Sequence, residues 1–204
     1  MTSRQASFDE FTQLDSELDS LLLALLNMLA VYRKQDPQFD LDPDEDAVRR
    51  SWGFRSEFDG NYSQIRTRLR NKLQGTPYKP KTETGMSVEH LDEIIENSAA
   101  SPPIVELHHD YYEHVEDEYY VQPGQFKEYE TPVLIPIMVE DDLVIYWDPY
   151  YDYFFGKPGN TNEMTISKNV FIELWSRGDR TRWTLWIERT TGQDTLAQFQ
   201  EGNT

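Results

Sequence analysis

A leucine-rich stretch near the start of the chain has to be surrounded by other parts of the protein. Ser7 and Glu10 form a capping box, and apolar side chains then recur in steps of three and four, which predicts a helix over residues 8–34. Further leucines widen this apolar stripe until the middle of the helix is apolar on almost every side. Such a helix is typical of a central core element. The residues of the stripe and its widening are Phe11, Leu14, Leu18, Leu21, Leu22, Leu23, Leu25, Leu26, Met28, Leu29 and Tyr32.

Three shorter helices are predicted after this one. Asp42 and Pro43 are typical of a helix start, and a stripe from Tyr62 to Leu73 predicts another helix that ends before Gly75. Residues 76–85 contain two prolines and two lysines and are predicted to be a linker. Ser87 then caps a short fourth helix.

The period of the apolar pattern changes after Pro102 and Pro103. Runs of branched and aromatic residues predict strands over 104–107, 119–121, 133–139, 143–147, 151–155 and 182–188. Glu140, Asp141 and Asp142 make a short connection, so the third and fourth of these strands should form an antiparallel hairpin. Ser167 caps one further helix.

Together these elements predict an α+β fold with a single domain over residues 1–189. Its N-terminal helical half, residues 7–97, carries the long central helix, and its C-terminal half, residues 103–189, carries an antiparallel sheet with one further helix. Residues 190–204 are polar and are predicted to form a flexible tail.

The charge and the cysteine content of the chain exclude several kinds of functional site. There are 37 Asp and Glu against 19 Lys and Arg, the net charge is -18, and no cysteine is present. Disulfides, thiolate nucleophiles and cysteine-ligated metals are therefore excluded. Only 7 of the basic residues are Lys, and the acids are spread along the whole chain, which is typical of a halophilic archaeon or its virus. The alternative is an ordinary acidic cytosolic protein.

No membrane association is predicted. The apolar run over residues 21–31 is interrupted by Asn27, follows a group of acids and is too short to span a bilayer. We expect a cytoplasmic protein, or a virion component if the chain is viral.

The residues most suited to a metal are His108, His109, Asp110 and His114. On a strand, His108, Asp110 and His114 would share a face, whereas on a helix His109 would lie beside Glu113. Imidazole and carboxylate groups suit a divalent transition metal. The same pattern also fits a half-exposed strand or an acidic loop without any cofactor.

One segment is positively charged, whereas the chain as a whole is negatively charged. Between residues 49 and 81 there are nine basic residues against two acids: Arg49, Arg50, Arg55, Arg66, Arg68, Arg70, Lys72, Lys79 and Lys81 against Glu57 and Asp59. Arg66 and Arg70 lie one helical turn apart and are candidate binding residues for an anion. The alternative is that these cations pair with acids of the protein itself or of a partner. The overall charge argues against nucleic-acid binding except through this segment.

The segment from Asp148 to residue 187 resembles part of a known protein family. Asp148 and Pro149 end a strand, a helix with Phe171 and Trp175 follows about twenty residues later, and a strand over 183–187 comes next. This order resembles the C-terminal half of bacteriocin-processing double-glycine cysteine peptidases and their papain-like relatives. The resemblance implies a papain-like scaffold in which Asp148 would orient a catalytic histidine. The chain has no cysteine, and residues 133–147 contain no histidine, so the implied domain is catalytically silent.

An aromatic run supplies further candidate binding residues: Tyr150, Tyr151, Tyr153 and Phe154. The run holds more rings than a small sheet can bury, which favours an interface with a protein partner or a second copy. Our first functional hypothesis is therefore a non-enzymatic binding or assembly protein. The alternatives are a metal-dependent hydrolase that uses the histidine cluster, and a structural component of a viral particle or another large complex.

The halophilic interpretation makes a testable prediction about salt. Each pair of like unit charges repels by about 1 kcal/mol at a separation of 4 Å in water. Raising the ionic strength from about 0.1 M to about 1 M shortens the Debye length from about 10 Å to about 3 Å, which removes most of this repulsion. We expect the melting temperature to climb steeply with KCl concentration up to the molar range. An equal melting temperature at low and molar KCl would contradict the halophilic origin.

Overall fold

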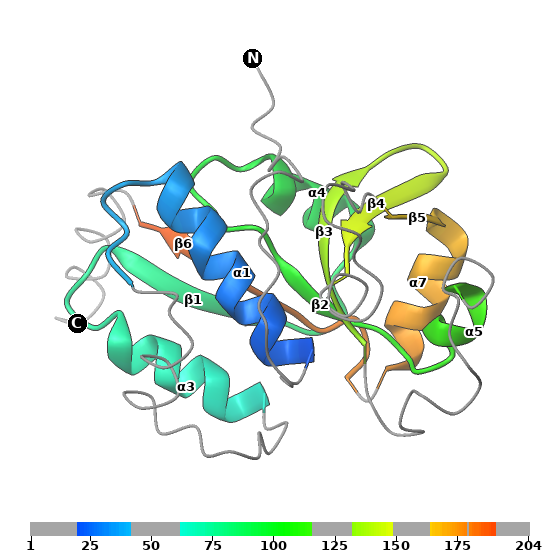
Figure 1. The fold of residues 1–204 in the computed structure, drawn as a ribbon, viewed down its shortest axis with the longest axis horizontal. Helices are drawn as coiled ribbons and strands as arrows, with labels where there is room; N and C mark the ends of the chain where they lie inside the picture. Colours follow the sequence, from blue (N-terminus) through cyan, green and yellow to red (C-terminus); the bar gives the residue numbers. More distant parts are fainter. Residues whose placement is uncertain (1–19, 42–61, 116–131, 149–163, 179, 191–204) are drawn as a thin grey trace, which may run out of the picture.

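A six-stranded antiparallel sheet connects the described parts of the chain (Figure 1). The computed structural model describes residues 20–41, 62–115, 132–148, 164–178 and 180–190. The strand order is β1-β6-β2-β3-β4-β5, and every neighbouring pair is antiparallel. The strands are β1 (Tyr78–Glu83), β2 (Ile104–Glu106), β3 (Val133–Val139), β4 (Leu143–Trp147), β5 (Met164–Ser167) and β6 (Thr184–Arg189). Helices combined with an antiparallel sheet confirm the predicted α+β class.

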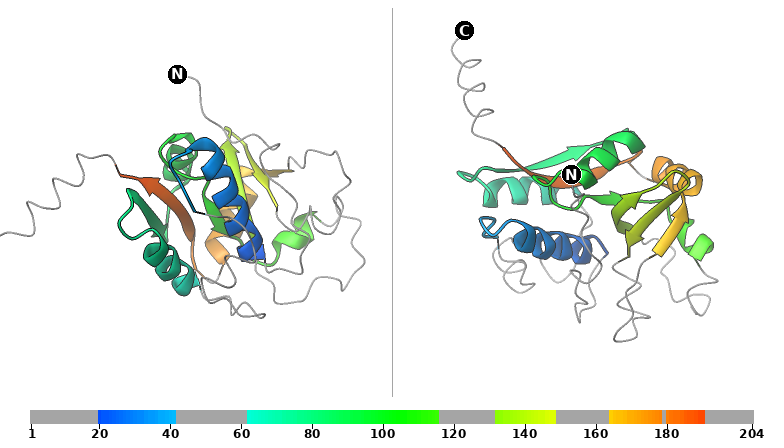
Figure 2. Two further views of the ribbon diagram at one scale, coloured as in Figure 1. Left: turned by 60° about the vertical axis from the view of Figure 1, so that its left-hand side comes forward. Right: turned by 90° about the horizontal axis from the view of Figure 1, so that it is seen from above.

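Helices cover both faces of this sheet (Figure 2). The helices are α1 (Ser20–Gln35), α3 (Tyr62–Lys72), α4 (Val88–Glu96), α5 (Tyr111–Val115) and α7 (Lys168–Arg177). Side chains alternate between the faces, so Leu185 and Ile187 of β6 pack with α1 and α3, whereas Trp186 packs with α4 and α7. The described residues therefore form three layers with one apolar core on each side of the sheet.

The central position of α1 agrees with its sequence. Leu21, Leu22 and Leu25 to Leu29 are at most 1% exposed, and the polar Asn27 is buried among them. α1 packs on β3 and β2, and Ile65 and Leu69 of α3 belong to the same apolar cluster. The helix thus buries almost its whole circumference, as its apolar surface requires.

Most of the predicted elements within the described residues are confirmed. The hairpin of β3 and β4 has the predicted bounds, and the fourth helix begins after Ser87, whose hydroxyl accepts a hydrogen bond from His90 N at 3.1 Å. α7 begins in the same way after Ser167. The predicted start of the first helix, the helix after Asp42, the strands at 119–121 and 151–155 and the tail beyond residue 190 lie outside the described residues.

The prediction of a linker over residues 76–85 is wrong. This segment contains β1, which pairs with β6 along its whole length, from Tyr78 opposite Arg189 to Glu83 opposite Thr184. Tyr78 and Pro80 are buried while Lys79 and Lys81 are exposed, so a strand alternation is present. Pro80 lacks an N–H donor and is tolerated because β1 lies at the edge of the sheet. A strand from the helical half thus completes the sheet.

Two further elements were not predicted. β5 is four residues long and pairs with β4 at the other edge of the sheet, directly before α7. The short helix α5 follows the histidine cluster. No helix in the described ranges combines the length and the apolarity needed to cross a membrane.

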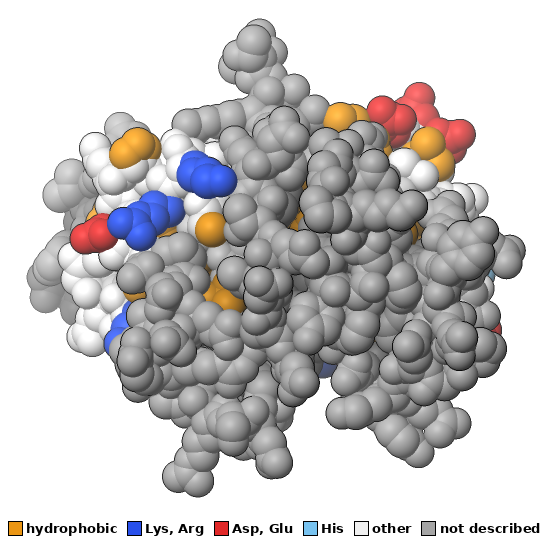
Figure 3. Space-filling view, viewed as in Figure 1, with side chains coloured by type: hydrophobic (Ala, Val, Ile, Leu, Met, Phe, Trp, Pro, Cys, Tyr) orange, Lys and Arg blue, Asp and Glu red, His pale blue; other side chains and the backbone are white. Residues whose placement is uncertain are grey.

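Exposed charges are separated on the face shown in Figure 3. Acidic side chains gather at the tip of the β3–β4 hairpin, where Glu140, Asp141 and Asp142 are exposed. Lys and Arg side chains lie at the opposite end, over α1 and α3, which both carry basic residues in their last turns. Cations at these positions interact favourably with the helix dipole.

An aromatic and ionic network fixes the end of α1. The Tyr78 hydroxyl donates to Asp36 Oδ2 at 2.9 Å, and Arg189 Nη1 lies 3.2 Å from the same oxygen. The rings of Tyr32, Phe39 and Tyr78 pack against one another with centroids 4.8 to 5.9 Å apart. Burial, followed by the hydrogen bond to Asp36, raises the pKa of Tyr78 to about 12. This network joins α1 to the paired strands β1 and β6.

The raised pKa of Tyr78 predicts a loss of stability at high pH. In the unfolded chain the hydroxyl ionises near pH 10, whereas the folded protein keeps its proton up to about pH 12, so the free energy of unfolding should fall between these values. Tyr78→Phe should make this fall shallower, although burial also raises the pKa of Tyr32. Urea unfolding at several pH values between about 9 and 12 measures both slopes. Equal slopes for the two proteins would contradict the assignment.

Candidate functional site

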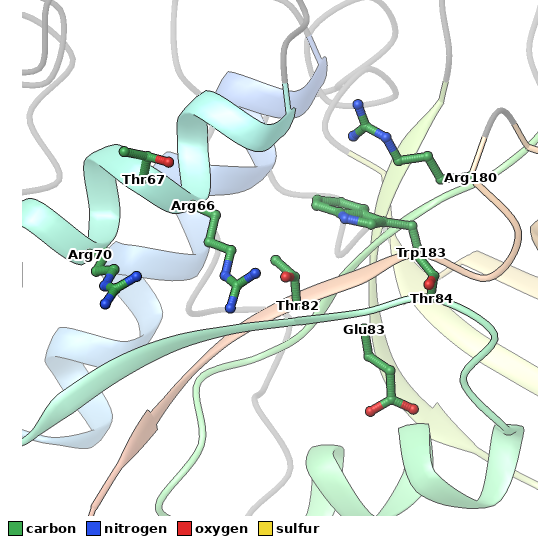
Figure 4. Close-up of a pocket in the computed structure, with 8 residues that line it drawn as sticks. All are labelled: Arg66, Thr67, Arg70, Thr82, Glu83, Thr84, Arg180 and Trp183. Atoms are coloured by element: carbon green, nitrogen blue, oxygen red, sulfur yellow. The ribbon is translucent and has the colours of Figure 1, made fainter. Parts of the chain in front are cut away.

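A pocket of about 570 Å³ lies between α3, the end of β1 and the turn before β6 (Figure 4). The side chains around it are mainly cationic or hydroxyl-bearing. Its lining residues are Arg66, Thr67, Arg70, Thr82, Glu83, Thr84, Arg180 and Trp183. Three arginines in one pocket are notable in a chain whose net charge is -18.

Arg66 and Arg70 reach the pocket because α3 is amphipathic. Ile65 and Leu69 face the core, which turns the residues that follow each of them toward β1 and solvent. Both arginines are exposed, and no ion pair with a carboxylate involves either of them in the described part of the chain. The predicted alternative, pairing with the protein's own acids, therefore does not apply to these two residues there.

Strand β1 presents hydroxyls to the pocket and turns its carboxylate away. Thr82 and Thr84 lie on the α3 side of the strand, whereas the Glu83 side chain points to the opposite side (Figure 4). There Glu83 Oε1 lies 3.3 Å from His90 Nδ1 of α4. The negative charge of Glu83 is thus directed away from the arginines.

The turn before β6 contributes Arg180 and Trp183. Backbone hydrogen bonds hold this turn: Trp183 N donates to Arg180 O at 3.0 Å, and Gly85 N donates to Thr181 O at 2.8 Å. Trp175 Nε1 donates to Trp183 O at 3.1 Å, which anchors the turn to α7. Trp183 is only 4% exposed, so it forms a rigid wall of the pocket.

The sequence predicted only part of this pocket. Arg66 and Arg70 were candidate binding residues, and the structure places them together. Arg180 and Trp183 were not predicted, because they reach the pocket through the pairing of β1 with β6, about a hundred residues apart in the chain. No local pattern signals that pairing.

A second group of polar side chains lies at the start of α5. His108 Nδ1 and His109 Nε2 are 3.1 Å and 3.2 Å from Asp110 Oδ1, and Arg177 Nη2 of α7 is 2.6 Å from Asp110 Oδ2. One potential ligand atom from each histidine and one from Asp110 all lie within 4.8 Å of one another. His108 and Asp110 are about one fifth exposed, and His109 is 59% exposed.

The electrostatics of this group centre on Asp110. Desolvation acts to raise its pKa, but the hydrogen bond from Arg177 and the charges of His108, Arg177 and His109 outweigh it, so the pKa of Asp110 is lowered. The carboxylate therefore stays ionised and able to bind cations at neutral pH.

His114 does not join this group in the described part of the chain. It lies in the last turn of α5 and is exposed, whereas His108, His109 and Asp110 lie in the turn before the helix. Residues 108–114 form neither a continuous strand nor a continuous helix, because a turn precedes the short helix α5. Three of the four predicted metal-ligating residues are brought together.

Asp148 lies at the end of β4 and is 2% exposed. The Tyr111 hydroxyl is 2.8 Å from Asp148 Oδ2 and 3.0 Å from the Tyr146 hydroxyl. Because a hydroxyl has one proton, Tyr111 donates it to the carboxylate and can accept from Tyr146. The Asp148 carboxylate thus accepts a hydrogen bond from a buried tyrosine hydroxyl.

The remaining candidate binding residues, Tyr150, Tyr151, Tyr153 and Phe154, lie outside the described residues. Comparison of the chain with known protein families and with curated proteins gave no match. The candidate sites are therefore assessed on their geometry and chemistry.

The Tyr111–Asp148 contact should contribute strongly to stability. Hydrogen bonds to charged groups contribute about 1.5–3 kcal/mol, and both groups are buried. Tyr111→Phe should lower the free energy of unfolding by an amount in this range. Combining it with Asp148→Ala, which removes the acceptor, in a double-mutant cycle measures the coupling of the pair. Additive effects of the two substitutions would show that the contact has no such role.

Proposed function

We propose that this chain is a non-enzymatic binding protein whose ligand carries more than one anionic group. The observation that carries the proposal is the set of three arginines around one pocket, two of them without a carboxylate partner among the described residues. Guanidinium groups bind phosphate and carboxylate through charge-assisted hydrogen bonds, and the threonine hydroxyls add donors. The volume of about 570 Å³ lies in the range of pockets that bind small molecules.

The arrangement of the arginines favours a ligand with several charges over a single ion. Arg66 and Arg70 extend from α3 on one side of the pocket, whereas Arg180 extends from the far side of Trp183 (Figure 4). A ligand with anionic groups at two or more positions can contact both sides. Oligophosphates and polycarboxylates, including an acidic peptide of a protein partner, have this chemistry.

Binding is favoured over catalysis by the composition of the pocket walls. A hydrolase needs a nucleophile or a general base beside the electrophilic groups. The lining residues include one carboxylate, and that carboxylate is directed at His90 across the sheet. Among the described residues, the pocket therefore has groups that hold an anion but none placed to activate water.

The papain-like scaffold and the halophilic origin of the chain are also proposals. The order of Asp148, the helix with Phe171 and Trp175 and the strand after it is the basis for a papain-like scaffold, and the missing cysteine would make that scaffold catalytically silent. The acidic, lysine-poor composition supports a halophilic origin. Neither is needed for the pocket to bind anions.

Calorimetric titration with tripolyphosphate and with citrate tests the proposal and separates phosphate from carboxylate ligands. We expect one of them to bind, and Arg66→Gln and Arg70→Gln each to weaken binding about tenfold, since each removes a charge-assisted hydrogen bond. Lys72→Gln is the matched control, because Lys72 is exposed on the same helix and does not line the pocket. It removes the same charge and should change affinity less than threefold.

Two outcomes would reject the proposal. The first is that neither anion binds at millimolar concentration. The second is that Lys72→Gln weakens binding as much as the arginine variants, which would indicate a general charge effect in place of a pocket.

A further inference from the structure

We propose that His108, His109 and Asp110 bind a divalent transition metal, and that this site is separate from the arginine pocket. The two sites lie on different elements: the arginine pocket on α3, β1 and the turn before β6, and the histidine group between β2 and α5. The inference does not depend on the proposed anion binding.

The spacing of the three groups matches a metal site. Zinc bonds to histidine nitrogen and carboxylate oxygen are about 2.0–2.2 Å long, which places neighbouring ligand atoms of a tetrahedral site about 3.3–3.5 Å apart. The two nitrogens lie 3.1 Å and 3.2 Å from Asp110 Oδ1. One ligand atom from each of the three residues lies within 4.8 Å of the other two, so an ion among them would be within reach of all three side chains.

Arg177 adds a feature that metal sites commonly have. Its guanidinium holds Asp110 Oδ2 at 2.6 Å, which leaves Oδ1 directed at the two imidazoles. A hydrogen-bonded partner of this kind fixes the orientation of a ligating carboxylate. The site would therefore use one oxygen of Asp110, and the second oxygen would remain with Arg177.

The backbone holds the two histidines in place for this role. His108 N donates to Leu174 O of α7 at 3.0 Å, and the next turn is closed by Tyr111 N donating to His108 O. The rings of His108 and His109 pack with centroids 3.9 Å apart. Asp110 N contacts His108 Nδ1 at 3.3 Å, a long hydrogen bond that the protein can exchange for a metal bond at small cost.

The ligand set indicates which metals suit the site. Two imidazoles and one carboxylate favour Zn²⁺, Co²⁺ or Ni²⁺ over Mg²⁺ and Ca²⁺, which prefer oxygen ligands. His109 is 59% exposed, so positions on the ion that the protein does not fill are open to water or to another molecule. Such a site resembles the three-ligand sites in which zinc keeps an open position.

The test is titration of the untagged full chain with Zn²⁺ alone and with Co²⁺ alone, at about pH 7.5. We expect one ion per chain, competition between the two metals, and visible absorption bands of bound Co²⁺. His109→Ala and Asp110→Asn should each weaken Zn²⁺ binding at least tenfold. The matched control is His90→Ala, which removes a half-buried histidine that also contacts a carboxylate, Glu83.

The outcomes decide the question in either direction. His109 is largely exposed, so His109→Ala should fold, and circular dichroism confirms this independently of metal. Zn²⁺ binding that is unchanged in His109→Ala and Asp110→Asn would overturn the proposal, and so would an equal loss of binding in His90→Ala. The same holds if the wild-type chain binds neither metal at millimolar concentration. Anion binding in Arg66→Gln is measured separately, so failure of one site leaves the other testable.

Discussion

The burial of α1 determines how the other elements are arranged. Its apolar surface extends around the helix, so one sheet face alone cannot cover it. The sheet covers one side of α1, and Ile65 and Leu69 of α3 join the same apolar cluster. The polar face of α3 must then point outward beside β1, which is where Arg66 and Arg70 line the pocket. The same helix that adds Ile65 and Leu69 to the core around α1 thus brings Arg66 and Arg70 to the pocket.

The two candidate sites depend on opposite layers of the structure. The arginine pocket uses the layer of α1 and α3, whereas the histidine group rests on α7 through Arg177 and Leu174. Trp175 connects the layers, because it lies in the core of the α7 side and donates to the backbone of Trp183 in the pocket wall. Each site therefore rests mainly on its own layer, and one hydrogen bond of Trp175 joins the two layers.

The sequence predicted those elements and residue groups that depend on neighbouring positions in the chain. Periodicity and capping residues located α3, α4, α7 and the β3–β4 hairpin, and neighbouring residues in the chain identified His108, His109 and Asp110. β1 was missed because its prolines and lysines are typical of a linker, and its strand character comes from the partner β6. Arg180 and Trp183 were missed for the same reason. His114 was grouped with the other histidines by proximity in sequence, but the start of α5 separates them.

The position of β6 also bears on how the chain can fold during synthesis. β6 is the last described strand in sequence, yet it lies between β1, made about a hundred residues earlier, and β2, made about eighty residues earlier. Until Thr184 to Arg189 leaves the ribosome, β1 has no neighbour in the sheet and β2 has only one. Contacts between residues so distant in sequence are slow to form, because the intervening loop must close first. The sheet is therefore completed only after nearly all of the described chain has been translated, and a ribosome-bound chain that stops before residue 184 cannot form the arginine pocket.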